Sequence, residues 1–380
     1  MDNTANHDEC MSALADAGIY LALDVNTPKY SLNRGDPNPS YNAEYLQSLF
    51  ATVDAFANYD NTLLFFSGNE VINNDQTTSC APYVKAVTRD LRQYIGSMGY
   101  RKIPVGYSAA DVESNRYEMA QYMNCGTDDE RSDFYAFNDY SWCDPSSYTQ
   151  SGWDQKVQKF SNYSIPLFLS EYGCITNKRT FGAVAAIYNP DQMAPVYSGG
   201  LVYEYSEEGS GYGLVKISGN QVTEKPDFQA LMSAFQKTPA PQGDGGAKTD
   251  NGTASQCPSA SPSWQLKSFS GSALPAIPEG AKKYMQQGAG KGPGLSGSGS
   301  QNAGGASTGT ASAGSGSVTA VATGHASSSA GSSGSSSSGA ASSASASSAA
   351  TSMLMGEMGA APFIVSGVVL VSTLLGATLL

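Results

Sequence analysis

The stretches Phe65-Phe66-Ser67-Gly68-Asn69-Glu70 and Leu169-Ser170-Glu171-Tyr172-Gly173 decide the fold that this sequence predicts. Each is a short apolar run of strand length that contains a glutamate at or near its end. Similar runs recur along the chain, and amphipathic stretches such as 45–57 and 83–98 lie between them. Strands that alternate with helices predict parallel βα units. The six predicted strands are Ile19–Val25, Thr62–Ser67, Lys102–Tyr107, Phe134–Tyr140, Pro166–Tyr172 and Gly200–Tyr205.

Polar residues follow these strands, one after another around the predicted sheet. They include Asp24, Asn69-Glu70, Asp111, residues 138–142, Glu171 and residues 204–207. A doubly wound open sheet gathers its ligand contacts near one switch point, whereas a (β/α)8 barrel carries them at the C-terminal ends of its strands. The pattern therefore favours an α/β fold, a (β/α)8 TIM barrel that lacks its first two strands, over residues 1–239.

The start of the chain agrees with that count. Met1 is followed by polar residues rather than by the charged and apolar regions of a secretory signal. We therefore expect an N-terminally truncated chain that begins at an internal methionine. We also expect such a chain to fold poorly or to be inactive alone, because an incomplete barrel has unpaired strand edges.

Glu70 and Glu171 stand at two non-adjacent predicted strands, which become strands four and seven of a complete barrel. An Asn-Glu pair at strand four and a Glu at strand seven resemble the large clan of retaining glycosidases. Such enzymes need two carboxyl groups about 5–5.5 Å apart, one as proton donor and one as nucleophile. The amide of Asn69 can hydrogen-bond a sugar 2-hydroxyl. A single glutamate is more often a surface or ion-paired carboxylate, but the pair in these positions favours catalysis.

The composition divides the rest of the chain. Residues 240–289 form a post-barrel segment, and residues 290–352 are so rich in Ser, Gly and Ala that they predict a disordered stalk. Residues 353–380 carry small residues followed by an uncharged apolar tail, which is typical of a GPI-anchor signal. A single transmembrane helix is the alternative. The net charge of −12 without a basic stripe excludes nucleic acid as an expected partner.

The six cysteines have no CxxC spacing, so they favour disulfides and an oxidising compartment over a zinc site. Two sequons, at Asn162 and Asn251, predict glycosylation. We therefore expect a protein of the extracellular face of the cell membrane, or of the cell wall, with no metal and no cofactor.

Five motifs give a specific resemblance over residues 5–285: Asn6–Met11, Leu21–Arg34, Tyr83–Asp90, Phe137–Cys143 and Ser198–Tyr205. By these motifs the chain is similar to the fungal β-1,3-glucanosyltransferases of glycoside hydrolase family 72. The resemblance implies an enzyme that cleaves β-1,3-glucan and transfers the new reducing end to a second glucan, which elongates the cell-wall polymer. The alternatives are a retaining endo-β-1,3-glucan hydrolase and an inactive truncated wall protein.

The resemblance implies that residues 29–36 form a loop that binds the glucan donor, and it implies roles for single residues. Glu70 would be the proton donor and Glu171 the nucleophile. Aromatic residues at strand ends, such as Tyr140, pack in the core about as often as they provide an apolar surface for a sugar ring. Asp111 and Arg116 could be a structural ion pair. The resemblance implies that donor and acceptor are both β-1,3-glucan. It implies that the glucan-binding residues are Lys29, Tyr30, Asn33, Arg34, Asp36, Asn69, Asp111, Arg116, Tyr140 and Tyr203.

The resemblance also implies two disulfides, Cys143–Cys174 beside the nucleophile and Cys125–Cys257 holding the post-barrel segment. Cys10 resembles a cysteine whose partner lies upstream, and Cys80 has no partner that the family suggests.

Overall fold

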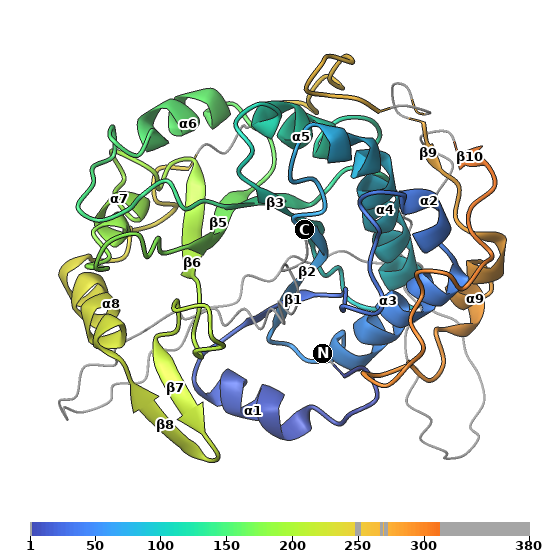
Figure 1. The fold of residues 1–380 in the computed structure, drawn as a ribbon, viewed down its shortest axis with the longest axis horizontal. Coiled ribbons are helices and arrows are strands. Elements are labelled where there is room, and N and C mark those ends of the chain that lie inside the picture. Colours follow the sequence, from blue (N-terminus) through green and yellow to red (C-terminus); the bar gives the residue numbers. More distant parts are fainter. Residues whose placement is uncertain (1, 248–251, 267–268, 270–272, 312–380) are drawn as a thin grey trace, which may run out of the picture. The chain divides into compact units, whose positions relative to one another are not determined.

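The computed structural model describes residues 2–247, 252–266, 269 and 273–311. Its centre is one sheet of six parallel strands in the order β1-β2-β3-β4-β5-β6. All six predicted strands are confirmed, with ends that shift by a few residues. Figure 1 shows the sheet curving, with helices along its outer side. The strands are β1 (Leu21–Asp24), β2 (Thr62–Asn69), β3 (Val105–Ala110), β4 (Phe134–Asn138), β5 (Leu167–Tyr172) and β6 (Tyr197–Val202).

The central strands are buried on both faces, as is usual for parallel strands covered by helices. Strands β3 and β4 pair without a register shift from Gly106↔Phe134 to Ala110↔Asn138. The first helices of the chain are α1 (Asp8–Asp16), α2 (Pro37–Ser40), α3 (Ala43–Phe56), the 3-10 helix η1 (Gln76–Cys80) and α4 (Ala81–Ser97). Those that follow are α5 (Arg116–Met123), α6 (Trp153–Phe160) and α7 (Ala183–Ile187).

Local chemistry starts and places these helices. The Asn42 side chain caps α3 by accepting a hydrogen bond from the Tyr45 amide at 2.9 Å. Helix α4 is buried along most of its length because it packs on β2 and β3, and the C-terminal part of the chain covers it. This burial explains why Lys85, Arg89 and Asp90 lie inside the protein, each with a polar partner.

The segment after the sheet contains elements that the sequence pattern did not predict. A hairpin, β7 (Val215–Ser218) and β8 (Gln221–Glu224), precedes α8 (Pro226–Lys237). Next come β9 (Leu274–Pro275), the 3-10 helix η2 (Glu279–Ala281), α9 (Tyr284–Gln287) and β10 (Thr310–Ala311). The disulfide Cys125–Cys257 is present, and Trp264 is fully buried against Tyr122 with ring centroids 5.4 Å apart. Residues 252–289 therefore complete the core where the structure describes them.

The prediction of a disordered stalk is wrong for its first residues. Residues 290–311 were expected to be disordered, but they lie along α2 and α3 and make hydrogen bonds there, such as Asn42 to Ser300 at 2.6 Å. Composition misleads here because the glycines permit close contacts that larger side chains would block. The remainder of the stalk, the GPI-anchor signal and Asn251 lie outside the described residues.

Candidate active site

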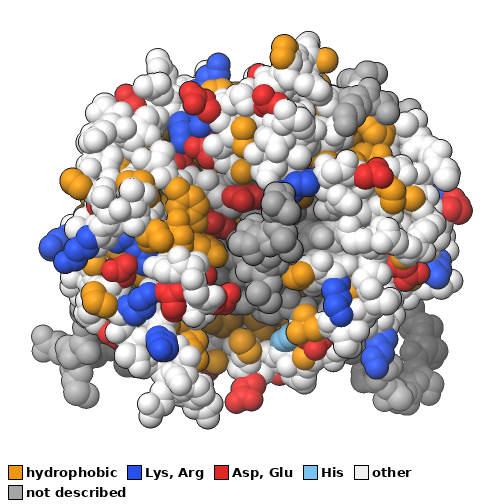
Figure 2. Space-filling view, viewed as in Figure 1, with side chains coloured by type: hydrophobic (Ala, Val, Ile, Leu, Met, Phe, Trp, Pro, Cys, Tyr) orange, Lys and Arg blue, Asp and Glu red, His pale blue; other side chains and the backbone are white. Residues whose placement is uncertain are grey.

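Glu70 and Glu171 lie at the same edge of the sheet. Glu70 directly follows β2, and Glu171 is the penultimate residue of β5. Because the strands are parallel, both carboxyl groups belong to the C-terminal edge, where such folds carry their active sites. Figure 2 shows acidic and hydrophobic side chains gathered near the middle of the same view of the molecule.

A network of short polar side chains joins the strands beneath the two glutamates. The Asn138 amide at the end of β4 donates to Glu70 Oε1 at 2.9 Å and to Asn69 Oδ1 at 3.0 Å. Its own Oδ1 accepts from Ser108 at 3.1 Å and from Ser170 at 2.8 Å. In the β4–β5 ladder, Asn138 pairs with Glu171. Asn138 therefore holds the Glu70 carboxylate and is the backbone neighbour of Glu171 in the adjacent strand.

Glu70 has an unusual backbone conformation. Its φ is +50°, in the left-handed region that non-glycine residues seldom adopt. A hydrogen bond from its amide to the Ser108 carbonyl, at 2.9 Å, holds the residue there. Strained residues of this kind cluster at functional sites, so the conformation supports a role for Glu70.

Glu171 lies in a more closed and aromatic environment. Burial raises its pKa to about 7, and the negative charges of Glu70 and Glu204 add to the rise. The Tyr140 hydroxyl opposes this by donating to Glu171 Oε2 at 2.5 Å.

Three tyrosines form one cluster beside Glu171. Tyr140, Tyr203 and Tyr212 pack edge to face, with ring centroids 5.2 to 6.4 Å apart. Arg179 connects two of them by donating to the Tyr203 carbonyl at 3.0 Å and to the Tyr212 carbonyl at 2.6 Å. Aromatic rings at an open edge can face the apolar side of a sugar ring.

Tyr212 belongs to a loop, residues 206–213, that sequence reasoning missed. The Glu207 carboxylate organises this loop by accepting hydrogen bonds from the amides of Gly209 and Gly211 at 2.9 Å and of Gly213 at 3.2 Å. Lys225 pairs with the same carboxylate. A glutamate followed by glycines at every second position is the signal that could have identified the loop.

The predicted donor loop, residues 29–36, is divided between buried and exposed positions. Tyr30 is only 4% exposed, and the Lys29 ammonium donates to the Gly297 carbonyl at 3.0 Å. Asn33, Arg34 and Asp36 are exposed. The Asn33 side chain accepts from the amide of Gly35 at 3.0 Å, which forms a local turn.

Asp111 and Arg116 form an ion pair, the alternative that the sequence left open. The second carboxylate oxygen of Asp111 pairs with Lys156 at 2.6 Å, and Lys156 also pairs with Asp139 at 2.5 Å. Although burial opposes it, the Lys156 ammonium holds the pKa of Asp139 below its usual range. Both oxygens of Asp111 are thus engaged, so its first role is to organise this edge of the sheet.

The disulfide Cys143–Cys174 is present and ties the segments that follow β4 and β5, with Cα atoms 5.0 Å apart. This disulfide restrains the two segments three residues after Tyr140 and three residues after Glu171. The buried Cys80 thiol donates to the Arg34 carbonyl at 3.0 Å, beneath the donor loop. No helix within residues 2–247 or the later described ranges is long and apolar enough to cross a membrane.

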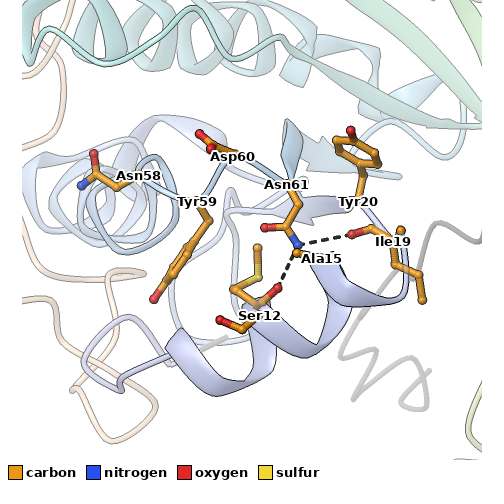
Figure 3. Close-up of a pocket in the computed structure, with 10 residues that line it drawn as sticks. Ser12, Ala15, Ile19, Tyr20, Asn58, Tyr59, Asp60 and Asn61 are labelled. Atoms are coloured by element: carbon orange, nitrogen blue, oxygen red, sulfur yellow. Dashed lines mark hydrogen bonds between the residues drawn. The ribbon is translucent and has the colours of Figure 1, made fainter. Parts of the chain in front are cut away.

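A separate pocket lies at the opposite end of the strands. It is lined by one face of α1, by Ile19 and Tyr20 before β1, and by residues 58–61 before β2 (Figure 3). The Asn61 amide crosses it and donates to the carbonyls of Met11 at 3.1 Å and Ile19 at 3.2 Å. The N-terminal face of such a sheet is usually concerned with stability, so this pocket is not the candidate active site.

Residues 1–239 match the family described as Glucanosyltransferase, glycoside hydrolase family 72. The chain is 68% identical over 298 residues to 1,3-beta-glucanosyltransferase gel1 of Aspergillus fumigatus, covering 78% of this chain and 65% of that protein. It is 50% identical over 294 residues to 1,3-beta-glucanosyltransferase GAS5 of Saccharomyces cerevisiae, covering 76% of this chain and 60% of that protein. A solved structure, Saccharomyces cerevisiae Gas2p in complex with laminaripentaose, is similar with a TM-score of 0.64 at 37% identity, covering 70% of this chain and 59% of that one. The chain thus spans about two thirds or less of the length of these relatives.

Proposed function

This chain belongs to the glucanosyltransferase family, glycoside hydrolase family 72, and we propose on that basis that it cleaves β-1,3-glucan and transfers the new reducing end to another glucan. Relatives at 68% and 50% identity carry the name 1,3-beta-glucanosyltransferase. A family structure has been solved with laminaripentaose, a β-1,3-linked glucose oligomer. The donor and the acceptor of this chain are then both β-1,3-glucan.

The reaction is a double displacement. Glu171 attacks the anomeric carbon, and Glu70 protonates the glycosidic oxygen, so that the reducing-end part of the donor leaves. A covalent glycosyl-enzyme remains on Glu171. Glu70, now ionised, takes the proton from the hydroxyl of the incoming glucan, whose oxygen displaces Glu171. Two inversions at the same carbon retain the configuration of the donor linkage.

The observation that carries this proposal is the position of Asn138. It hydrogen-bonds Glu70 Oε1, pairs with Glu171 in the neighbouring strand, and rests on two serines that orient its amide. Two carboxyl groups at one sheet edge, one of them held by a residue of the strand that neighbours the other, suit glycoside cleavage. Asn69, beside Glu70, is proposed to bind the sugar 2-hydroxyl in the same site.

The remaining sugar contacts are proposed from exposure and position. Tyr140 and Tyr203 would face sugar rings beside Glu171, and Asn33, Arg34 and Asp36 would contact the donor from the exposed part of their loop. Asp111 and Arg116 are proposed at the border of the site, where their ion pair leaves the guanidinium partly accessible.

Incubation with reduced laminari-oligosaccharides tests the reaction. Products longer than the substrate are expected, since the glycosyl-enzyme is passed to a sugar. Products that are only shorter would mean that water is the acceptor and that the chain is a hydrolase. Unchanged substrate would contradict both activities.

Azide separates the two glutamates. In Glu171→Ala, azide can occupy the space of the nucleophile and attack the anomeric carbon directly, so the glycosyl azide should have inverted configuration. In Glu70→Ala, the glycosyl-enzyme still forms on activated donors, and azide should give a product with retained configuration. The reverse pattern would exchange the two roles.

We further propose that β1 to β6 correspond to strands three to eight of a (β/α)8 barrel. The supporting features are their parallel order and the polar residues at their C-terminal ends. In the described part of the chain, nothing pairs with the outer edges of β1 and β6. The catalytic domain would comprise residues 1–239, and residues 240–289 would support it.

Membrane attachment is a separate proposal that rests on residues 353–380. Release of the full chain from membranes by a phosphatidylinositol-specific phospholipase would support a GPI anchor on the extracellular face. Retention after this treatment would favour a transmembrane helix. Glycosylation is proposed at Asn162, which is exposed, and at Asn251, and a mass shift with glycosidase treatment tests both.

A further inference from the structure

Residues 289–311, which we call the strap, are held at successive points by the N-terminal part of the chain. In Figure 1 this orange segment follows α9 and runs beside α3. The Gln47 amide in α3 donates to the carbonyls of Ala289 at 3.0 Å and Lys291 at 2.8 Å. The Asn3 side chain accepts from the Gly294 amide at 2.9 Å. The strap therefore has a defined path despite its low-complexity composition.

The middle of the strap contacts three consecutive residues of the predicted donor loop. Lys29 donates to the Gly297 carbonyl at 3.0 Å, and its own carbonyl accepts from the Ser300 amide at 3.0 Å. The Tyr30 hydroxyl accepts from the Gly299 amide at 3.3 Å. The Gln301 amide donates to the Ser31 carbonyl at 2.6 Å. Backbone and side chain of the loop are both engaged, so the contact has a fixed register.

Glycine is required at the closest point of this contact. A Cβ atom at position 297 would lie 2.1 Å from the Tyr30 hydroxyl oxygen and 2.8 Å from Pro293 Cβ. At position 309, in the same strap, a Cβ atom would meet nothing within 4 Å. The strap thus contains one glycine whose replacement must move the contact and another whose replacement need not.

The opposite side of the donor loop is connected to the catalytic edge. Asn26, three residues before the loop, donates to the Ser67 carbonyl in β2 at 3.2 Å. Near its other end, the Arg34 carbonyl accepts from the Cys80 thiol.

We propose that the strap is a positioning element of the glucan site, which holds the donor loop so that Asn33, Arg34 and Asp36 face the sugar. Lys29 and Tyr30 are then anchors for the strap rather than sugar contacts, because the strap occupies the ammonium of one and buries the ring of the other. The proposal rests on the proposed function, since the loop is assigned to the glucan donor. It gives part of the predicted stalk a role in substrate binding.

Two glycine variants of the full chain test the proposal. Gly297→Ala should raise KM for a laminari-oligosaccharide donor about fivefold and leave kcat nearly unchanged, because a displaced loop weakens binding without touching the carboxyl groups. Gly309→Ala, the matched control, should leave both constants as in the wild type.

Limited proteolysis provides a second measurement that does not depend on activity. The strap of Gly297→Ala should be cut several times faster than that of Gly309→Ala. Equal KM values in the two variants, or a lowered kcat at unchanged KM, would overturn the positioning role. If the wild type leaves β-1,3-glucan uncut, the proposed function fails by itself, and equal cutting of the two straps would then show that the strap does not hold the loop.

Discussion

Glu70 and Glu171 are the same kind of residue at the same edge of one sheet, but the protein holds them in different ways. Glu70 is fixed by polar groups, with an amide hydrogen bond from Asn138 and a left-handed backbone. Glu171 is fixed by burial and by tyrosines, and its pKa is raised to about 7. Different surroundings allow two carboxyl groups to take different roles, which is what a double displacement requires.

Tyr140 reconciles the raised pKa with the role proposed for Glu171. A nucleophile must be ionised, and burial alone favours the neutral acid. The short hydrogen bond from the Tyr140 hydroxyl stabilises the anion and so limits the rise of the pKa. The aromatic side of the site therefore combines a dry environment, which strengthens electrostatic effects, with a donor aimed at the charge.

The largest effect should come from removing the buried charge. Between its unfolded pKa near 4.5 and its folded pKa of about 7, Glu171 binds more protons in the folded state, so its contribution to stability falls as pH rises through this window. Glu171→Gln should therefore be more stable than the wild type above pH 7, by up to about 3 kcal/mol, and about equal to it at pH 4.5. Urea unfolding at both pH values measures the difference.

Glu70→Gln provides the comparison for that experiment. It removes one of the charges that raise the pKa of Glu171, so the loss of stability with rising pH should be smaller than in the wild type. If Glu171→Gln is no more stable than the wild type at pH 8, burial does not raise the pKa of Glu171 as we infer.

The polar side can be broken at Asn138. Asn138→Ala removes the donor that holds Glu70, and a misplaced proton donor should lower kcat by about 100-fold. Asn138→Asp has the same shape but cannot donate, so it should be similarly impaired. Ser170→Ala removes only one bond to Asn138 and should have a smaller effect. Steady-state kinetics on laminari-oligosaccharides would contradict the inference if Asn138→Asp kept wild-type activity.

The aromatic side can be weakened at Tyr140. Tyr140→Phe keeps the ring and removes the hydrogen bond that lowers the pKa of Glu171, so that pKa should rise. We expect kcat/KM to fall about tenfold and its acidic limb to move to higher pH. Tyr203→Phe is the control, because it removes a hydroxyl group from another tyrosine of the same cluster. An unmoved acidic limb in Tyr140→Phe would show that this hydroxyl does not set the ionisation of Glu171.

The smallest effect should come from the loop that carries Tyr212. Glu207→Gln replaces the carboxylate that accepts from three glycine amides and pairs with Lys225. The loop should loosen, and KM should rise about threefold with kcat unchanged. Glu208→Gln changes the exposed neighbouring residue and should leave KM as it is. Equal KM values for the two variants would mean that Glu207 does not order the site.

The difference between the two sides also shows which features a sequence can reveal. Asn69-Glu70 and Glu171 were found because each belongs to a strand with a clear apolar pattern. Asn138 was seen as a polar strand end, but nothing in its own stretch indicates that it binds Glu70 and neighbours Glu171. These two relations depend on the register of β3, β4 and β5, which is decided by packing across the sheet.

Loops were the harder part for a similar reason. The roles of Glu207 and Arg179 come from contacts with backbone groups, and a sequence pattern does not encode which carbonyl or amide will be near. The strap was misjudged because composition measures how little apolar surface a segment has, whereas Gly297 is used for its lack of a side chain.

The sequence by itself determined the six parallel strands, their alternation with helices, and the two glutamates at their C-terminal ends. These features follow from local periodicity and from the chemistry of residue types, both of which can be read along the chain. Only the tertiary structure decided that Asn138 binds Glu70 beside the strand of Glu171, that the Tyr140 hydroxyl binds Glu171, and that the strap is bound to residues 29–31. Such contacts join residues far apart in the sequence, so they exist only once the sheet has brought its strands together.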